Sequence, residues 1–216
     1  MIRVGVHGAT GRMGRLVLAE VEAAPDLTLA WTCGRKLAPS LAADVIVDFS
    51  APEALLQLLE VATCPVVTGT TGLVLSPDQR VPVLHAANFS VGVAVLARAV
   101  REATRALPGW DVEIVELHHS HKRDAPSGTA LRLAEGLGRV VTGRKGARGH
   151  GEVGVHAVRG GDVVGEHTVY LCGPGERLQL GHVAQNRAIF AKGALRAARW
   201  LVGKPAGLYR IEDVLS

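Results

Sequence analysis

The first half of the chain alternates short apolar runs with stretches of helical period. Ile2–His7 is rich in β-branched residues, and a glycine-rich turn separates it from a periodic run that ends before Pro25. Alternation of this kind predicts a strand, and apolar residues at every third or fourth position predict a helix. The same order recurs, so we expect strands at Leu27–Trp31, Val45–Phe49, Pro65–Thr68 and Val81–Leu84, and helices at Met13–Ala24, Pro52–Ala62 and Val91–Leu107.

After Pro108 the pattern changes, because strands now outnumber helices. The turn sequences "RGGD" and "GPGE" separate three alternating runs and are typical of turns between antiparallel strands. A glycine-rich basic loop, "GRKGARGHG", precedes them. The elements expected here are strands at Asp111–His118, Glu152–Val158, Glu166–Cys172 and Arg177–Ala184, and helices at Ser127–Val140 and Arg187–Leu201.

Together the two patterns predict an α/β fold with two domains. Strands that alternate with helices predict a Rossmann-like, doubly wound parallel sheet over residues 1–89, and the last helix is long enough to return to it with residues 187–216. Residues 90–186 predict a second, α+β domain with an open mixed sheet. Only one or two helices are available to cover that sheet, so self-association through its apolar face is expected.

Composition indicates a globular α/β protein without a membrane span. The 216 residues suffice for one large or two small domains, and 48% hydrophobic residues with 26 glycines are typical of a globular α/β protein. No apolar run approaches the roughly 20 residues that a membrane span requires, and the first strand begins without a signal-peptide pattern. We therefore expect a cytoplasmic protein with no membrane partner.

The charge pattern argues against a nucleic-acid-binding protein, and the cysteine content argues against a disulfide framework or a zinc site. The net charge is +4, yet the basic residues are scattered and no nucleic-acid motif accompanies them, so an anionic small ligand is favoured over nucleic acid. Cys33, Cys64 and Cys172 are odd in number and far apart, without a C-x-x-C spacing. Neither a disulfide framework nor a zinc site is indicated, and reduced, mostly buried thiols are expected.

The sequence "VHGATGRMGR" follows the first strand and opens the first helix. A dinucleotide requires a tight turn there, close backbone approach to a pyrophosphate, and N–H groups at a helix amino terminus. The spacing is Gly8-x-x-Gly11-x-x-Gly14, with Thr10 where a second glycine is usual. The motif predicts a dinucleotide site, and a plain strand-to-helix turn is the alternative.

The end of the second strand bears on the choice of nucleotide. An acidic residue normally binds the adenosine ribose there, but this chain has Cys33 and Gly34 followed by Arg35 and Lys36. Two cations without a carboxylate suit a 2′-phosphate, which favours NADPH over NADH. The alternative is that both cations begin a solvated loop.

Two further small-residue segments follow predicted strands. "VTGTTG" spans Val67–Gly72 and "HAANFSVG" spans His85–Gly92. Ligands of open parallel sheets bind outside the carboxyl ends of the strands, so these segments are expected to line a nicotinamide-ribose pocket. Ordinary turn chemistry is the alternative.

The segment Glu116–Ala130, "ELHHSHKRDAPSGTA", concentrates groups that carry protons and charge. Alternation along a strand puts Glu116 and His118 on one face, away from His119. A histidine is the natural general acid near neutral pH, and Lys122 in the following loop can anchor an anion and donate a proton. The segment therefore predicts proton transfer to a ligand.

Pro126 suits the first turn of a helix that begins with Ser127, Gly128 and Thr129. The backbone amides at this point, with the Thr129 hydroxyl, predict a carboxylate-binding site.

A metal site is an alternative for the same segment, because His119 and His121 are spaced as i and i+2. No cysteine or nearby carboxylate completes a ligand set, and Lys122 would repel the ion. We expect no metal, and a purely structural role for the segment is the other alternative.

The segment resembles the signature of the 4-hydroxy-tetrahydrodipicolinate reductase family, also called dihydrodipicolinate reductase, whose pattern is E-x-H-H-x-x-K-x-D-x-P-S-G-T-A. The resemblance extends in order over nearly the whole chain, through "GATGRMGR", "VDFSAPEA", "PVVTGTTG", "AANFSVGV", "VRGGDVVGEHTVYL", "FAKGALRAARWL" and "GLYRIEDVL". Two departures are that the chain is shorter than the family norm, at "GRKLAPSLAAD" and "LSPDQR", and that Cys33 replaces an acidic residue.

The resemblance implies roles for individual residues. His118 would exchange a proton with the substrate, and Lys122 would be a second proton donor. The dicarboxylate substrate would be held by His119, Ser127, Gly128 and Thr129. Motifs and resemblance together assign NADPH or NADH to Gly8, Ala9, Thr10, Gly11, Arg12, Met13, Cys33, Gly34, Arg35, Lys36, Gly69, Thr70, Thr71, Ala86, Ala87, Asn88 and Phe89.

The resemblance also implies a reaction and an assembly. Water would leave 4-hydroxy-tetrahydrodipicolinate and a hydride would arrive from C4 of the nicotinamide, giving tetrahydrodipicolinate for diaminopimelate and lysine biosynthesis. The first domain would bind the dinucleotide, and residues 90–186 would bind substrate and form a homotetramer. Two alternatives are a related imine dehydrogenase, such as an aspartate dehydrogenase, and a non-catalytic NADPH-binding sensor.

Overall fold

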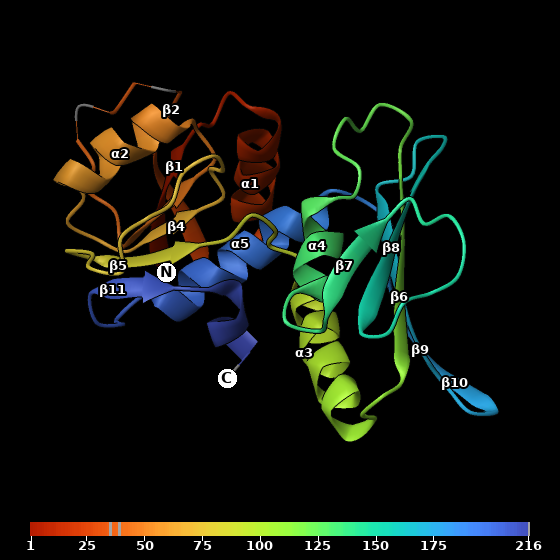
Figure 1. Cartoon of the computed structure of the whole chain (residues 1–216). Helices are drawn as coiled ribbons and strands as arrows, with labels where there is room; N and C mark the ends of the chain where they lie inside the picture. The colour runs from red at the N-terminus through yellow and green to blue at the C-terminus, as the bar shows by residue number, and fades with distance from the viewer. Residues whose placement is uncertain (35, 39, 216) are drawn as a thin grey trace. The chain divides into compact units, whose positions relative to one another are not determined.

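The structure is a computed structural model that describes residues 1–34, 36–38 and 40–215 (Figure 1). Arg35, one of the expected nucleotide-binding residues, lies outside the described residues. The chain separates into two compact units, one made of Met1–Val91 with Arg187–Ser216 and the other of Gly92–Asn186. Across the described ranges, every helix is too short or too polar to cross a membrane.

The first unit contains a six-stranded sheet in the order β11-β5-β4-β3-β1-β2. Every neighbouring pair in it is parallel. The chain leaves β1 toward β2 and then returns to β3 on the other side, so the sheet is doubly wound, as the sequence predicted. Its strands are β1 (Ile2–His7), β2 (Leu27–Cys33), β3 (Val45–Asp48), β4 (Val66–Thr68), β5 (Pro82–His85) and β11 (Gly207–Tyr209).

Three helices cover this sheet. Figure 1 shows α2 (Pro52–Val61) and α5 (Ala188–Leu201) on opposite faces. Leu55 and Leu58 of α2 pack with Ile46 and Val66 of the strands in one buried cluster. The helix α1 (Arg12–Ala23) contacts β1, β2 and α5. The loops that the sequence predicts to bind a nucleotide follow the central strands and lie at their carboxyl ends.

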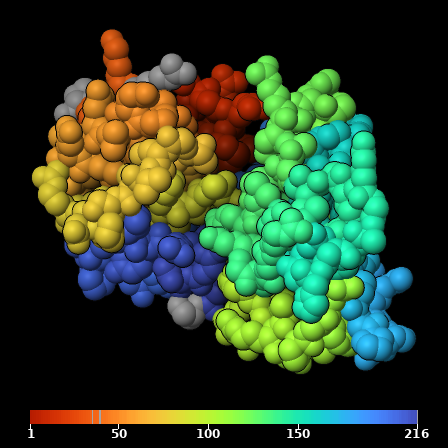
Figure 2. All heavy atoms as spheres, viewed as in Figure 1, coloured from red at the N-terminus to blue at the C-terminus, as the bar shows by residue number. Residues whose placement is uncertain are grey.

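The connection between β4 and β5, residues 69–81, contains no helix, and all of its residues are described. Parallel neighbours are usually joined through a helix that covers the sheet. Here Leu75 is buried in the cluster around Leu55 and Leu58, and Leu73 and Val81 pack against it. Figure 2 shows this connection, in yellow, at the surface beside α2, in orange. The loop therefore supplies the apolar cover that a helix would give.

The second unit contains a five-stranded mixed sheet in the order β10-β9-β6-β8-β7. The central strand β6 is parallel to β8 and antiparallel to β9. The helices α3 (Val91–Ala106) and α4 (Gly128–Ala134) pack on one face, against a cluster that includes Val112, Ile114 and Val169. The strands are β6 (Asp111–His118), β7 (Arg139–Thr142), β8 (Glu152–Arg159), β9 (Gly165–Gly173) and β10 (Glu176–Ala184).

Three details of the sequence prediction are wrong. The helix predicted to reach Val140 ends at Ala134, because Gly136 (φ +76°) and Gly138 (φ +159°) adopt backbone angles that helices exclude. Residues 139–142 instead pair with β8 as strand β7. The strands that "RGGD" joins, β8 and β9, run antiparallel as predicted, but they are not neighbours, because β6 lies between them. The short strand β11 and the 3-10 helix Ile211–Leu215 were not predicted.

Candidate active site

The glycine loop after β1 is shaped by close backbone approaches. Gly8 has a φ of +79°, and a side chain there would collide with the backbone of Phe49. A side chain at Gly14 would collide with the carbonyl of Gly8. The helix α1 then begins after its N-cap residue, Gly11. This arrangement fits a dinucleotide, because it brings bare backbone and helix N–H groups to the point where a pyrophosphate binds.

The end of β2 lies directly against this loop. The N–H of Gly8 donates to the carbonyl of Gly34 (3.2 Å), and the N–H of Ala9 donates to the carbonyl of Cys33 (2.9 Å). Burial raises the pKa of the Cys33 thiol, so it carries no negative charge at neutral pH. Lys36 is exposed. The position where a ribose-binding carboxylate is usual is therefore uncharged.

A buried carboxylate ties two neighbouring strand ends together. Asp48 is fully buried at the end of β3 and accepts hydrogen bonds from Thr68 Oγ1 (2.7 Å), Thr70 Oγ1 (2.7 Å) and Ser50 Oγ (2.6 Å). Burial acts to raise the pKa of Asp48, but hydrogen bonds from His7 and these hydroxyls hold it below its usual value. Ionised Asp48 thus fixes the loop that holds the expected nucleotide-binding residues 69–71.

The expected residues after β5 differ in exposure. The N–H of Ala86 donates to the carbonyl of Thr68 (3.1 Å), which places residues 86–89 beside the β4 loop. Ala87 is exposed, whereas Phe89 is 2% exposed and packs edge-on against Phe49, with ring centroids 5.7 Å apart. The Phe89 side chain therefore packs in the interior of the unit, against Phe49.

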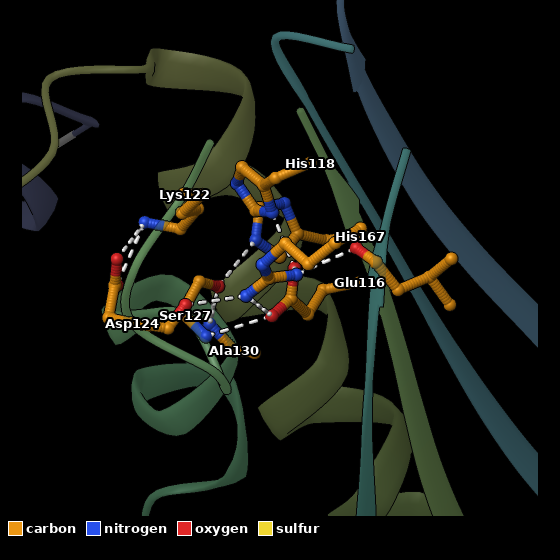
Figure 3. A network of polar contacts seen from close by, with 9 residues as sticks. Glu116, His118, Lys122, Asp124, Ser127, Ala130 and His167 are labelled. Carbon is orange, nitrogen blue, oxygen red and sulfur yellow. Dashed lines mark hydrogen bonds and ion pairs between the residues drawn. The ribbon is translucent and has the colours of Figure 1, made fainter. Parts of the chain in front are cut away.

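In the second unit, a buried glutamate organises the signature segment (Figure 3). Glu116 is fully buried and accepts a bidentate pair of hydrogen bonds from Arg159, at 2.8 Å each, and one from the N–H of Ser127 (2.9 Å). Nδ1 of His118 also contacts it. Burial acts to raise the pKa of Glu116, but Arg159, Ser127 and His118 together hold it below its usual value. Glu116 is therefore an ionised acceptor inside the fold.

His118 lies at the end of β6, on the same face as Glu116, as the alternation predicted. Because an ionised carboxylate can only accept, Nδ1 of His118 donates to it. The Nε2 atom lies beside Gly165, where a built Cβ would approach it to 2.9 Å. The Nε2 atom of His118, which Glu116 does not contact, is thus bordered by a residue without a side chain.

Lys122 lies in the loop between β6 and α4, and its Nζ donates to both carboxylate oxygens of Asp124, at 2.7 and 2.8 Å. The Lys122 side chain is 22% exposed and that of Asp124 is 57% exposed. Hydrogen bonding from Lys122 lowers the pKa of Asp124. The Lys122 ammonium group is therefore paired with a more exposed carboxylate in the same loop.

The residues at the start of α4 join the same network. Ser127 is its N-cap, and its Oγ accepts from the N–H of Ala130 (3.2 Å). The Oγ also lies within hydrogen-bond distance of Nε2 of His167 (3.2 Å). Gly128 is exposed, and a built Cβ there meets nothing within 4 Å. Space for a ligand therefore lies beside the predicted substrate-binding residues Gly128 and Thr129.

The remaining histidines of the segment form no metal site in the part of the chain that the structure describes. The rings of His119 and His121 lie 6.4 Å apart, tilted at 44°.

Two participants were not identified from the sequence. Arg159, from β8, neutralises Glu116, and its Nη2 also donates to the carbonyl of Asp124 (2.6 Å). His167, from β9, packs edge-on against His118 with centroids 5.1 Å apart. Both lie far from the signature along the chain, in "VRGGD" and "GEHTV", and only the strand order β9-β6-β8 brings them to it.

Comparisons with known proteins agree with this architecture. The family described as "Dihydrodipicolinate reductase, N-terminus" matches residues 2–38 and 32–97, and "Dihydrodipicolinate reductase, C-terminus" matches residues 92–215. The 4-hydroxy-tetrahydrodipicolinate reductase of Sulfurimonas denitrificans is 43% identical over 253 residues, covering 100% of this chain and 99% of the relative. That of Rubrobacter xylanophilus is 44% identical over 260 residues, with the same coverage.

Solved structures show the fold. A dipicolinate-bound dihydrodipicolinate reductase from Paenisporosarcina sp. TG-14 superposes with a TM-score of 0.79 at 22% identity, covering 99% of each chain. A diaminopimelate dehydrogenase from Clostridium tetani gives a TM-score of 0.55 at 13% identity, covering 100% of this chain and 96% of that one. The fold prediction, a Rossmann-like α/β sheet with a second mixed sheet, is confirmed.

Proposed function

The chain belongs to the dihydrodipicolinate reductase family, and from this premise we propose that it reduces 4-hydroxy-tetrahydrodipicolinate to tetrahydrodipicolinate for diaminopimelate and lysine biosynthesis. The observation that carries the proposal is the full-length match, at about 40% identity, to relatives named as this reductase. The signature segment, with His118 on a buried carboxylate, is intact within that match.

The first unit is proposed to bind the reduced nicotinamide nucleotide. Family membership implies such a cofactor, and the bare backbone at Gly8, Gly11 and Gly14 fits one. We propose NADPH over NADH, because the neutral Cys33 replaces a ribose-binding carboxylate and the cationic residues Arg35 and Lys36 follow Gly34 in the sequence. Such a protein is expected in the cytoplasm, where reduced nucleotides are supplied.

The second unit is proposed to bind the dicarboxylate substrate. Ser127, Gly128 and Thr129 would hold one carboxylate at the start of α4, and His119 would contribute a further contact. Lys122 would exchange its Asp124 partner for a substrate carboxylate, since the two groups are chemically equivalent.

The chemistry follows from the charges that develop. When bound, the reduced nicotinamide supplies a hydride from its C4 atom. Hydride addition to the conjugated ring leaves negative charge on the substrate, which a proton from Nε2 of His118 neutralises. Lys122 offsets the carboxylate charge that would otherwise oppose the hydride. The substrate loses one water and takes up one hydride and one proton.

The second sheet is proposed as the interface of a homotetramer. Helices α3 and α4 cover the face of Ile114, whereas Leu117 and its cross-strand neighbour Val158 lie on the other face. Val183 shares that face, because it and Leu117 both pair with Glu166. Val158 is 45% exposed and Val183 is 60% exposed, so contact with other copies would remove apolar surface from water.

The alternatives have less support. An aspartate dehydrogenase from Thermotoga maritima shares the fold with a TM-score of 0.50 at 14% identity, which carries no information on the substrate. A non-catalytic sensor would not require the two proton-carrying side chains His118 and Lys122 in one segment.

The test is oxidation of NADPH and of NADH, followed by absorbance, with substrate generated in place from pyruvate and aspartate semialdehyde by a synthase. We expect turnover to require substrate, to be faster with NADPH, and to fall at least about 10²-fold in Lys122→Ala. Lys145→Ala, an exposed lysine in the loop before β8, is the control and should retain activity. A folded protein that oxidises neither nucleotide would refute the proposal.

A further inference from the structure

We propose that Glu116 is a positioning residue that fixes His118 in the tautomer with the proton on Nδ1 and thereby reserves Nε2 for the substrate. The inference deepens the proposed function and rests on it for the role of His118. Glu116 itself is fully buried and touches no ligand space, so its effect is exerted through the imidazole.

The contacts of Glu116 define the tautomer. Its Oε1 accepts from the N–H of Ser127 (2.9 Å) and from Nη2 of Arg159 (2.8 Å). Its Oε2 accepts from Nη1 of Arg159 (2.8 Å) and contacts Nδ1 of His118. Two of these three partners, the amide and the guanidinium, can only donate, so the carboxylate stays ionised. His118 must therefore also donate, through Nδ1.

The groups around His118 reinforce this assignment. Arg159 compensates the buried charge of Glu116, so a full carboxylate is sustained beside the ring. The other ring in contact, His167, packs edge-on against His118, and its Nε2 lies 3.2 Å from Ser127 Oγ rather than on Nδ1 of His118. Lys122 is held by Asp124. Glu116 is thus the acceptor that the structure provides for Nδ1.

The same carboxylate also fixes the start of the substrate site. Ser127 is the N-cap of α4, and its backbone N–H is held by the oxygen of Glu116 that Arg159 also contacts. One buried group thus sets the orientation of the proton donor and the position of the residues proposed to bind the carboxylate. In the other tautomer Nδ1 would face a donor instead of a carboxylate, so the ring could not hold the second proton that Nε2 must give to the substrate.

The variant Glu116→Gln is designed to change the tautomer of His118 while the fold is kept. The amide oxygen of glutamine can still accept from Ser127 and from Nη2 of Arg159, whereas its NH2 group then faces His118 and Nη1 of Arg159. His118 is expected to accept at Nδ1 and to move its proton to Nε2. Substrate binding is retained in this variant, because the Ser127 contact is retained.

The first measurement is long-range ¹H–¹⁵N NMR of histidine-labelled protein without substrate, at about pH 8.5, where histidine at its ordinary pKa is neutral. The His118 signals are assigned from their loss in His118→Gln. We expect the Nδ1–H form in the unmodified protein and the Nε2–H form in Glu116→Gln. An Nε2–H form in the unmodified protein overturns the inference, even if Glu116→Gln fails to fold.

The second measurement is steady-state turnover. Glu116→Gln should lower kcat by about 10²- to 10⁴-fold, a range seen where a catalytic histidine is forced into the wrong tautomer, and should change KM by less than about threefold. The control is Glu113→Gln on the same strand, which removes a carboxylate from His156 Nε2 (2.6 Å) on the opposite face. Equal losses in both variants would overturn the inference. If neither the unmodified protein nor any variant turns over, the proposed function fails while the tautomer result stands.

Discussion

At the scale of single residues, the charge of His167 is set by its surroundings. It is 4% exposed, and burial, followed by the nearby His118, lowers its pKa to about 4 from an ordinary 6.5. The Nε2 atom of the neutral ring hydrogen-bonds with Ser127 Oγ, which also caps α4. A proton on His167 would put a positive charge into this buried site, beside His118.

A pH dependence of stability follows from this lowered pKa. The unfolded chain protonates His167 below about pH 6.5 and the folded chain only near pH 4, so stability is full above pH 6.5 and is lost as pH falls toward 4. The loss from this group is roughly 3 kcal/mol. Burial lowers the pKa of His182 in the same direction and adds to the loss.

Chemical denaturation at several pH values, compared between the unmodified protein and His167→Gln, isolates the contribution of His167. Glutamine can keep an acceptor for Ser127 but does not titrate. The difference in unfolding free energy should shrink between pH 7 and pH 4.5. His150→Gln, at an exposed position, is the control. Parallel pH profiles for His167→Gln and the unmodified protein would contradict the account.

Some residues of the site could be predicted from the sequence and others could not. The alternation of a strand was sufficient to put Glu116 and His118 on one face, because that property is local. Arg159 and His167 could not be assigned, since their contacts depend on which strands flank β6. The local signals were an arginine at the end of β8 and a histidine near the start of β9.

At the scale of elements, the loop between β4 and β5 replaces a covering helix. Leu75 is 8% exposed within the cluster of Leu55 and Leu58, whereas the adjacent Val74 is 97% exposed. Leu75→Ala should lower the unfolding free energy by about 2 kcal/mol or more, and Val74→Ala should change it by less than about 0.5 kcal/mol. Calorimetry or denaturant unfolding measures both. Equal effects would show that the loop does not cover the sheet.

The elements that sequence periodicity predicted well are those with many regularly spaced residues. The strand at Asp111–His118 was placed at its observed bounds, and the helix predicted at Val91–Leu107 is one residue shorter, ending at Ala106. Periodicity failed at β7, where Gly136 and Gly138 end the preceding helix earlier than its apolar spacing suggested. It also failed at β11, because three residues are too few to show a period.

At the scale of the whole molecule, the open face of the second sheet predicts association. Light scattering should give a mass four times the 22.7 kDa of one chain. Val158→Asp with Val183→Asp should reduce this mass, because both put a charge on the proposed interface. Val74→Asp, on the first unit, is the control. A monomeric unmodified protein, at concentrations well above those of the assay, would contradict the proposed tetramer.

The central claim is that this chain transfers a hydride to a ring that has lost water. The most direct measurement uses NADPH carrying two deuterium atoms at nicotinamide C4, with substrate generated in place, and determines the mass of the product. We expect tetrahydrodipicolinate heavier by one deuterium than the product from unlabelled NADPH, formed in proportion to nucleotide oxidised. Product without deuterium, or oxidation that does not depend on the substrate, would contradict it.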